Sequence, residues 1–358
     1  MWRVETASRL HLGLLSLPAA GDARSPVMRR FGGVGLMIDG PGIVLHAAPA
    51  STWAADGPLA SRALAFARRV ADAVRAEHPS LVLIPQYLRI DRAPPEHIGL
   101  GVGTQLGLAV AGVLAHAWGL PADAARLARW CGRGLRSALG VHGFAGGGFL
   151  VEGGKRAEQE LSPLVARVAL PPAWRIVLIR PDTTPGVHGS REQAAFAGLS
   201  MPPEVCGELC RLVLLGMLPA LAESDLPAFG EAVYEFNRRV GEVFATVQGG
   251  TYSSPAVEQT VRFLRQLGVR GVGQSSWGPR CSPWSATTPP RMTWCDECRP
   301  TWRSSALTWQ SPGRATTAPS SRKRRNRPRG RSTNAASGHR GGLAVGEREG
   351  VSPPRASC

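Results

Sequence analysis

Gly99, Gly101 and Gly103 alternate with apolar residues directly before Thr104 and Gln105. The segment follows an expected strand and opens an expected helix. Glycine has no Cβ, so backbone N–H groups can approach an oxygen-rich ligand, and a helix N-terminus attracts negative charge. The spacing therefore predicts a phosphate or diphosphate site made by these five residues. A plain strand-to-helix turn also uses glycines, and the pattern matches neither the Walker loop nor the dinucleotide fingerprint.

A second group of residues suited to anion chemistry lies in other glycine-rich segments. Its members are Arg9, His11, Arg30, Arg136, Ser137 and His142. A planar guanidinium pairs bidentately with phosphate or carboxylate, so we expect Arg9 and Arg30 to bind substrate anions together with Ser137. We expect His142, His11 and Arg136 to be catalytic. The alternative is that the arginines are solvated and each histidine is a satisfied core residue.

Small hydrogen-bond donors also follow an expected strand much later in the chain. Gln274, Ser275 and Ser276 directly precede Trp277. Amide and hydroxyl groups can bind phosphate, and an indole can stack on an aryl ring. We therefore expect these four residues to contact the ligand, unless they form a turn with Trp277 as a core anchor. We also expect His188, which lies in a short Gly-rich segment, to bind substrate.

The periodicity of residues 1–279 predicts an α+β chain in two domains. Strands are expected at 4–6, 81–90, 148–151, 175–179 and 269–273, and helices at 61–77, 106–118, 122–131, 204–222, 226–244 and 256–267. Pro171 and Pro172 mark the expected hinge. We therefore place an N-terminal phosphate-loop domain at 1–170, a smaller C-terminal α+β domain at 171–279 and a tail at 280–358.

The tail differs from the rest of the chain in composition. Lys and Arg outnumber Asp and Glu by 15 to 4 there, so the tail supplies most of the net charge of +16. It also holds four tryptophans and four cysteines without hydrophobic periodicity. The chain has 2 lysines against 40 arginines, which indicates GC-rich codons. Dropping two nucleotides from such a back-translation near Arg280 restores a strand, a turn and a helix. We therefore interpret the tail as a low-order product of a reading-frame error.

Two motifs in the tail lose their significance under this interpretation. Cys295 and Cys298 have zinc-ligand spacing but no well-spaced second pair. The basic segment 322–329 could bind nucleic acid by neutralising phosphates, and nucleic-acid binding stays open as an alternative function.

The glycine-rich segment resembles the phosphate loop of the GHMP kinase superfamily, with the pattern Pro-x-x-x-Gly-Leu-Gly-x-x-Thr/Ser. Further segments narrow the resemblance: 7–14, 29–35, 132–144, 146–154 and 271–279. In this order they are similar to the β-ribofuranosylaminobenzene 5′-phosphate synthase family, over about residues 1–279. The resemblance implies a GHMP-kinase-like α+β fold of two domains, followed by a disordered or aberrant tail.

The same resemblance implies a transferase. The family condenses phosphoribosyl pyrophosphate with 4-aminobenzoate or 4-hydroxybenzoate, releasing pyrophosphate and CO2, early in tetrahydromethanopterin biosynthesis. Small-molecule substrates are the implied partners. Mg2+ is the implied cofactor, because a hard cation would neutralise the diphosphate. No cluster of carboxylates in the sequence marks its site.

The chain departs from the kinase pattern at two places. Superfamily kinases usually have Ser-Ser where this chain has Gly103 and its neighbours, and several have a catalytic Asp where this chain has His142. Without that base, phosphoryl transfer to a hydroxyl lacks an activating group. An ATP-dependent small-molecule kinase is therefore the alternative function.

The remaining features favour a cytoplasmic enzyme without a membrane or nucleic-acid partner. The apolar stretch at 106–115 ends at His116, short of the roughly 20 residues that span a bilayer. The N-terminus has no signal-peptide pattern, and the cysteines form no regular framework. A homodimer is compatible with these features.

Overall fold

The computed structural model describes residues 1–17, 29–156, 161–181, 199–275 and 284–285. All of these belong to one compact unit, Met1–Gly313. His188, Ser276 and Trp277 lie outside the described residues, as does the tail apart from 284–285, so the interpretation of the tail stays a prediction.

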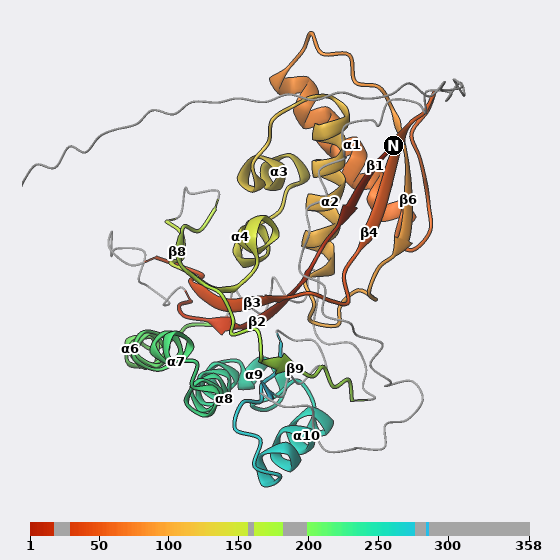
Figure 1. The fold of residues 1–358 in the computed structure, drawn as a ribbon. Helices are drawn as coiled ribbons and strands as arrows, with labels where there is room; N and C mark the ends of the chain where they lie inside the picture. Colours follow the sequence, from red (N-terminus) through yellow and green to blue (C-terminus); the bar gives the residue numbers. More distant parts are fainter. Residues whose placement is uncertain (18–28, 157–160, 182–198, 276–283, 286–358) are drawn as a thin grey trace, which may run out of the picture. The chain divides into compact units, whose positions relative to one another are not determined.

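The first sheet pairs four strands in the order β1, β4, β6 and β5. Their bounds are Trp2–Glu5 (β1), Val44–Pro49 (β4), Gln86–Arg92 (β6) and Ala54–Asp56 (β5). Helices α1 (Ala60–Glu77) and α2 (Val102–Ala117) pack on this sheet (Figure 1). Helix α1 buries Ala63, Phe66, Ala67, Val70 and Val74. This is the i, i+3, i+4 spacing of a helix with one apolar face.

The second sheet is antiparallel, in the order β2, β3, β7 and β8. Its strands are Ser8–Leu14 (β2), Gly33–Ile38 (β3), Phe149–Glu152 (β7) and Leu164–Val168 (β8). Helix α4 (Leu139–Gly146) contacts β2, β3 and β7, and α3 (Ala124–Cys131) packs beside it. Helix α8 (Leu226–Val243) contacts β2 from the other side (Figure 1). Strand β2 is thus enclosed between two helices.

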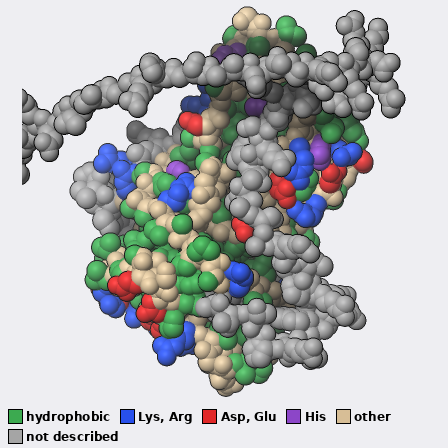
Figure 2. All heavy atoms as spheres, in the orientation of Figure 1, with side chains coloured by type: hydrophobic (Ala, Val, Ile, Leu, Met, Phe, Trp, Pro, Cys, Tyr) green, Lys and Arg blue, Asp and Glu red, His purple; other side chains and the backbone are tan. Residues whose placement is uncertain are grey.

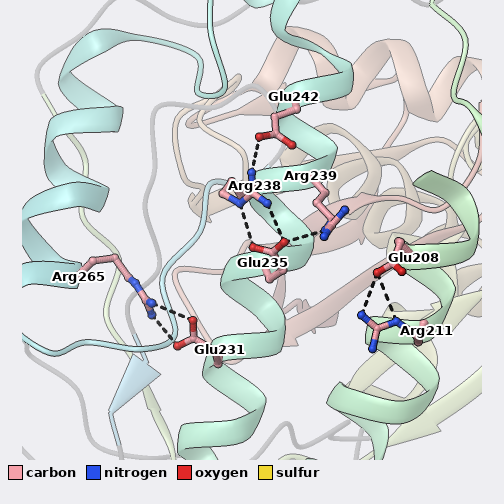
Figure 3. Close-up of polar contacts among 8 residues, drawn as sticks. All are labelled: Glu208, Arg211, Glu231, Glu235, Arg238, Arg239, Glu242 and Arg265. Atoms are coloured by element: carbon pink, nitrogen blue, oxygen red, sulfur yellow. Dashed lines mark hydrogen bonds and ion pairs between the residues drawn. The ribbon is translucent and has the colours of Figure 1, made fainter. Parts of the chain in front are cut away.

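The remaining helices surround α8. They are α6 (Pro203–Arg211), the π-helical segment η1 (Leu212–Met217), α7 (Leu218–Glu223), α9 (Ala245–Gln248) and α10 (Pro255–Gln266). A two-stranded sheet pairs β9 (Arg175–Ile176) with β10 (Trp284–Ser285). Ion pairs cover the outer side of α8: Glu235 binds Arg238 and Arg239, while Glu231 binds Arg265 of α10 (Figure 3).

The continuous helical segment Pro203–Glu223 is long and apolar enough to cross a membrane by length and composition alone. A helix over residues 204–222 was expected here, but a membrane span was considered from the sequence only for the apolar stretch at 106–115. A core helix of a soluble protein meets the same test, and α6, η1 and α7 all contact α8. Leu214 and Leu215 of η1 are exposed. Figure 2 shows hydrophobic side chains gathered over this part of the molecule.

Most expected elements are present with small shifts at their ends, and two expectations about strands are wrong. The segment 81–90 is extended as a strand only from Gln86, after Pro85, and Val82 and Ile84 are exposed. The segment 269–273 forms no strand, although residues 271–275 are buried. The expected boundary between residues 170 and 171 stays a prediction. One hydrophobic core cluster contains residues from both sides of it, since it joins β-sheet residues to α8.

Phe229 carries part of that shared core. This fully buried residue of α8 makes edge contacts with Phe149 of β7, at 5.7 Å between ring centroids, and lies 5.1 Å from Trp174. We expect Phe229→Ala to lower the free energy of unfolding by about 3–5 kcal/mol, since it leaves a cavity in the core. Urea denaturation of the full chain measures this free energy of unfolding. The control Phe263→Ala, at a 57% exposed position, should change it by less than about 0.5 kcal/mol. Equal effects would contradict the prediction.

Candidate active site

The phosphate loop opens α2 without a side-chain cap. Gly101 is the N-cap residue, in the left-handed conformation with φ +67°, and no side chain caps the helix there. Gly99 is also left-handed, with φ +81°. The amides of Thr104 and Gln105 donate to the Gly101 carbonyl at 3.0 and 3.2 Å, so the Val102 and Gly103 amides before them are the ones that an anion could bind. This geometry agrees with the predicted phosphate site.

Ser275 joins the phosphate loop to strand β2. Its hydroxyl donates to the carbonyl of Gly99 at 2.6 Å and accepts the His11 amide at 3.0 Å. A Cβ on Gly99 would lie 2.4 Å from the Ser275 carbonyl, so only glycine permits this approach. The amide of Arg9 also donates to the Leu100 carbonyl at 3.0 Å. Three segments far apart in sequence therefore meet here.

A cavity of about 520 Å³ lies against this junction. Among the predicted site residues, it is lined by Arg9, His11, Thr104, Arg136, Ser137 and Gln274. Its apolar wall includes Phe31 together with Val240 and Phe244 of α8. The described lining residues include arginines and polar groups but no Asp or Glu. The cavity therefore suits an anionic ligand that also carries an apolar part.

His11 lies in the cavity wall as a neutral imidazole. Burial, with the charge of Arg9 as a second cause, lowers its pKa to about 3. Its Nε2 is buried and has no hydrogen-bond partner among the described residues. A Cβ added to Gly33 would lie 3.3 Å from this Nε2 and 3.1 Å from Oε1 of Glu152. His11 therefore lines the cavity without adding a second positive charge beside Arg9.

Glu152, at the end of β7, supports the loop that carries Arg136 and Ser137. The residue is fully buried, and its Oε2 accepts the Ala138 amide at 2.6 Å. Burial raises the pKa of Glu152, against the hydrogen bonds from Ser137 and the Ala138 amide and the charge of Arg9. The side chain thus fixes the start of α4 next to the cavity.

Some predicted residues hold the site together without lining the cavity. Gln105 is buried and donates to the Gly140 carbonyl at 2.9 Å, which ties α2 to α4. Gly99 and Ser275 form the junction described above, and Gly101 lies under Arg9, whose Nε is 3.1 Å from the Cβ position. These residues are structural supports of the phosphate loop.

Two predicted residues are not brought into the cavity. Nε2 of His142 lies 2.8 Å from the carbonyl of Ser162, and the carbonyl of His142 accepts Arg167 at 2.7 Å. Arg30 pairs through its backbone with Lys155, at 2.8 and 2.9 Å. Neither lines the cavity. The geometry gives no support to a catalytic His142 or to Arg30 as a ligand of this cavity.

Sequence reasoning missed several residues that build the site. Asn237 of α8 is buried, donates to the carbonyls of Leu12 and Gln274, and accepts the Gln274 amide, each at 2.8 Å. The side chain of Gln274 in turn accepts the Ser253 amide at 2.8 Å. A buried Asn within an amphipathic helix was the available signal for Asn237. For Glu152, the signal was a carboxylate ending an apolar strand.

The described residues contain no group of three His, Cys, Asp or Glu side chains placed to hold a metal ion. Proteins commonly bind Mg2+ through one or two carboxylates together with substrate phosphates. Glu96, the described carboxylate beside Gly103, is already paired with Arg62. Mg2+ would therefore be held mainly by the bound diphosphate, and the cofactor stays a prediction.

The fold places the chain in a known class. Residues 65–149 match the family model of the GHMP kinases N-terminal domain. Phosphomevalonate kinase of Streptococcus pneumoniae superposes with a TM-score of 0.59 at 12% identity, over 80% of this chain and 91% of that one. Mevalonate pyrophosphate decarboxylase of Streptococcus pyogenes superposes with a TM-score of 0.57 at 12% identity, over 79% of this chain and 88% of that one. The α+β architecture is thus that of the GHMP kinase superfamily, as predicted.

Relatives with higher sequence identity define the family. The β-ribofuranosylphenol 5′-phosphate synthase of Archaeoglobus fulgidus is 32% identical over 250 residues, covering 65% of this chain and 74% of the relative. The synthase of the same name from Methanothermobacter thermautotrophicus is 29% identical over 299 residues, covering 77% and 86%. The chain belongs to the β-ribofuranosylphenol 5′-phosphate synthase family. The predicted resemblance is confirmed.

The neutral state of His11 predicts a specific acid sensitivity. Its pKa in the folded chain is about 3, below the ordinary 6.5. The unfolded chain therefore takes up a proton between these pH values that the folded chain does not, and stability falls as pH drops through this window. We expect the free energy of unfolding to fall less from pH 7 to pH 4 in His11→Gln than in the wild type. His116→Gln, which removes an exposed imidazole, is the control. Parallel pH profiles of His11→Gln and the wild type would refute the prediction.

We expect the stability of the fold to depend on Glu152 as a buried hydrogen-bond acceptor and not on its negative charge. In Glu152→Gln the amide oxygen still accepts from Ala138, so we expect a loss of less than about 1.5 kcal/mol in the free energy of unfolding. Glu152→Ala leaves that amide unpaired and opens a cavity, and should lose about 2–5 kcal/mol. Chemical denaturation of both variants at pH 7 makes the comparison. A loss as large in Glu152→Gln as in Glu152→Ala would show that the charge itself is needed.

Proposed function

We propose that this chain condenses phosphoribosyl pyrophosphate with 4-hydroxybenzoate, releasing pyrophosphate and CO2, as a step of tetrahydromethanopterin biosynthesis. The observation that carries the proposal is a cavity that joins a phosphate loop and arginines to an apolar wall. The relatives are named for a ribofuranosylphenol product, which favours the hydroxy acid over 4-aminobenzoate for this chain. The reaction class, an aryl ribosyl transfer, follows from family membership.

The reaction breaks the bond between ribose C1 and the diphosphate oxygen, and the electron pair leaves with the diphosphate. The ring carbon that bears the carboxylate attacks C1. The carbon–carboxylate bond then breaks, its electrons restore the aromatic ring, and CO2 departs. The phenol proton is released during attack and returned afterwards, so the overall reaction needs no external acid or oxidant.

The chain's residues meet these demands in different parts of the cavity. Arg9 and Arg136 supply positive charge for the 5-phosphate and the carboxylate. Phe31 and Phe244 offer apolar surface to the aryl ring. The neutral imidazole of His11 can hydrogen-bond the phenol hydroxyl, while the buried junction around Ser275 holds His11 and the phosphate loop in register.

The cavity favours this transferase over a kinase. Hydroxyl activation in phosphoryl transfer commonly needs a carboxylate base. Since the described lining residues include no Asp or Glu, the kinase alternative lacks its activating group there. A cytoplasmic location, a homodimer and the exclusion of nucleic acid remain proposals.

Release of labelled CO2 tests the function. We expect carboxyl-labelled 4-hydroxybenzoate to lose CO2 only when phosphoribosyl pyrophosphate is present with Mg2+. A parallel reaction with labelled 4-aminobenzoate tests the choice of acid. The chain as given should be compared with one whose frame is restored near codon 280, because activity confined to the restored chain would show that the tail is damage. ATP turnover without CO2 release from a folded, restored chain would overturn the proposal.

Arg9 provides the matching mutational test. We expect Arg9→Met to lower kcat/KM for phosphoribosyl pyrophosphate by about 10- to 100-fold, the cost of losing charge-assisted hydrogen bonds. Arg167→Met is the control, since Arg167 of β8 binds backbone carbonyls of Gly147 and His142 and does not line the cavity. An equal loss in both variants would remove Arg9 from the site.

A further inference from the structure

The guanidinium groups of Arg62 and Arg133 lie close together over the start of α2. A Cβ on Gly103, the second residue of the helix, would lie 2.6 Å from Nη2 of Arg62 and 3.3 Å from Nη2 of Arg133. Helical Cβ atoms point back toward the N-terminus. Both guanidinium groups therefore lie beside the amides that open the helix. Arg62 comes from α1 and Arg133 from the turn after α3.

Phe66 of α1 supports both side chains. The Cζ of Arg133 lies 4.9 Å from the centroid of the Phe66 ring, and the Cζ of Arg62 lies 5.9 Å from it. Phe66 is itself buried. A fixed aromatic surface orients the two arginines, which removes part of the entropy that a flexible cation loses on binding a ligand.

The charges around this place are not balanced by the described residues. Arg62 forms an ion pair with Glu96. The Nε of Arg133 is buried and makes no hydrogen bond to any described residue. Burial lowers the pKa of Arg62, and burial together with the charges of Arg62 and Arg69 lowers that of Arg133. Partly buried cations crowded in this way are stabilised by an added anion.

We propose that Arg62, Arg133 and the opening amides of α2 form the site for the diphosphate group of the substrate, and that Glu96 holds Arg62 until the ligand arrives. The proposal deepens the proposed function and rests on it for the name of the ligand. Arg133 and Thr104 also line the cavity. A diphosphate held at α2 is therefore joined to a ribose that lies in the cavity, next to Arg9 and His11.

The identity of residue 103 fits this assignment. Superfamily kinases usually have serine at this place, and a side chain at 103 would occupy the space that Arg62 fills here. The glycine allows two arginines to lie against the helix start. This chain thus brings fixed positive charge to a position where a serine would bring a hydroxyl.

Calorimetric titration of the full chain with inorganic diphosphate tests the site without needing the synthase reaction. We expect Arg62→Gln and Arg133→Gln to weaken binding by about 10- to 100-fold each. Arg68→Gln removes the same charge from an exposed position of the same helix, α1, and should bind as the wild type does. Glu96→Gln should bind diphosphate about 3- to 10-fold more tightly, because it releases Arg62 and removes a repelling charge. Misfolding cannot produce this gain.

Two further titrations identify the source of the diphosphate. Phosphoribosyl pyrophosphate should bind with the same dependence on Arg62 and Arg133. If ATP binds with the same dependence on Arg62 and Arg133, and at least as tightly as phosphoribosyl pyrophosphate, the site belongs to a nucleotide and the substrate proposed here is wrong. Unchanged diphosphate binding in Arg62→Gln and Arg133→Gln, or weaker binding in Glu96→Gln, would overturn the site itself. Arginine-dependent diphosphate binding in a chain that releases no CO2 would keep the site and reject only the synthase function.

Discussion

The hydroxyl of Ser275 is the interaction on which the candidate site depends. It connects the Gly99 carbonyl of the phosphate loop with the His11 amide of β2 through one donated and one accepted hydrogen bond. Both partners are main-chain groups, so the contact fixes the backbone and not only a side chain. A buried unpaired backbone group costs about 1–3 kcal/mol. The native arrangement of loop and strand is therefore strongly favoured over one in which they separate.

Asn237 extends this constraint to the helical part of the chain. Its amide uses two donors and one acceptor to join α8 to Leu12 of β2 and to Gln274, the neighbour of Ser275. A fully satisfied buried network specifies one arrangement, because any shift leaves a polar group unpaired. The helix that supplies Val240 and Phe244 to the cavity is thereby registered against the strand that supplies Arg9 and His11. The cavity combines residues from both sides of the expected domain boundary.

The sequence predicted those parts of the site whose chemistry is local. Gly99 and Gly101 could be identified because a positive φ depends on neighbouring residues. Arg62, Glu152 and Asn237 could not, because their roles depend on partners far away in the chain. Packing against residues far away in the chain also determined that the expected strand at 269–273 does not form. The Gln274 amide directly after it donates to the Asn237 side chain.

The electrostatics of the site separate binding from acid–base chemistry. The His11 imidazole is kept neutral by burial and by Arg9, while Glu152 is fully buried behind the cavity with one oxygen on the Ala138 amide. The arginines are left to carry the charge of the cavity. Cations crowded at a helix N-terminus raise the energy of the empty site, and an anionic substrate relieves that repulsion when it binds. Pyrophosphate departure increases the negative charge on the leaving group, so the same cations stabilise it more strongly as the bond breaks. A site built in this way can favour ribosyl transfer through fixed positive charge, with no Asp or Glu among the described residues that line the cavity.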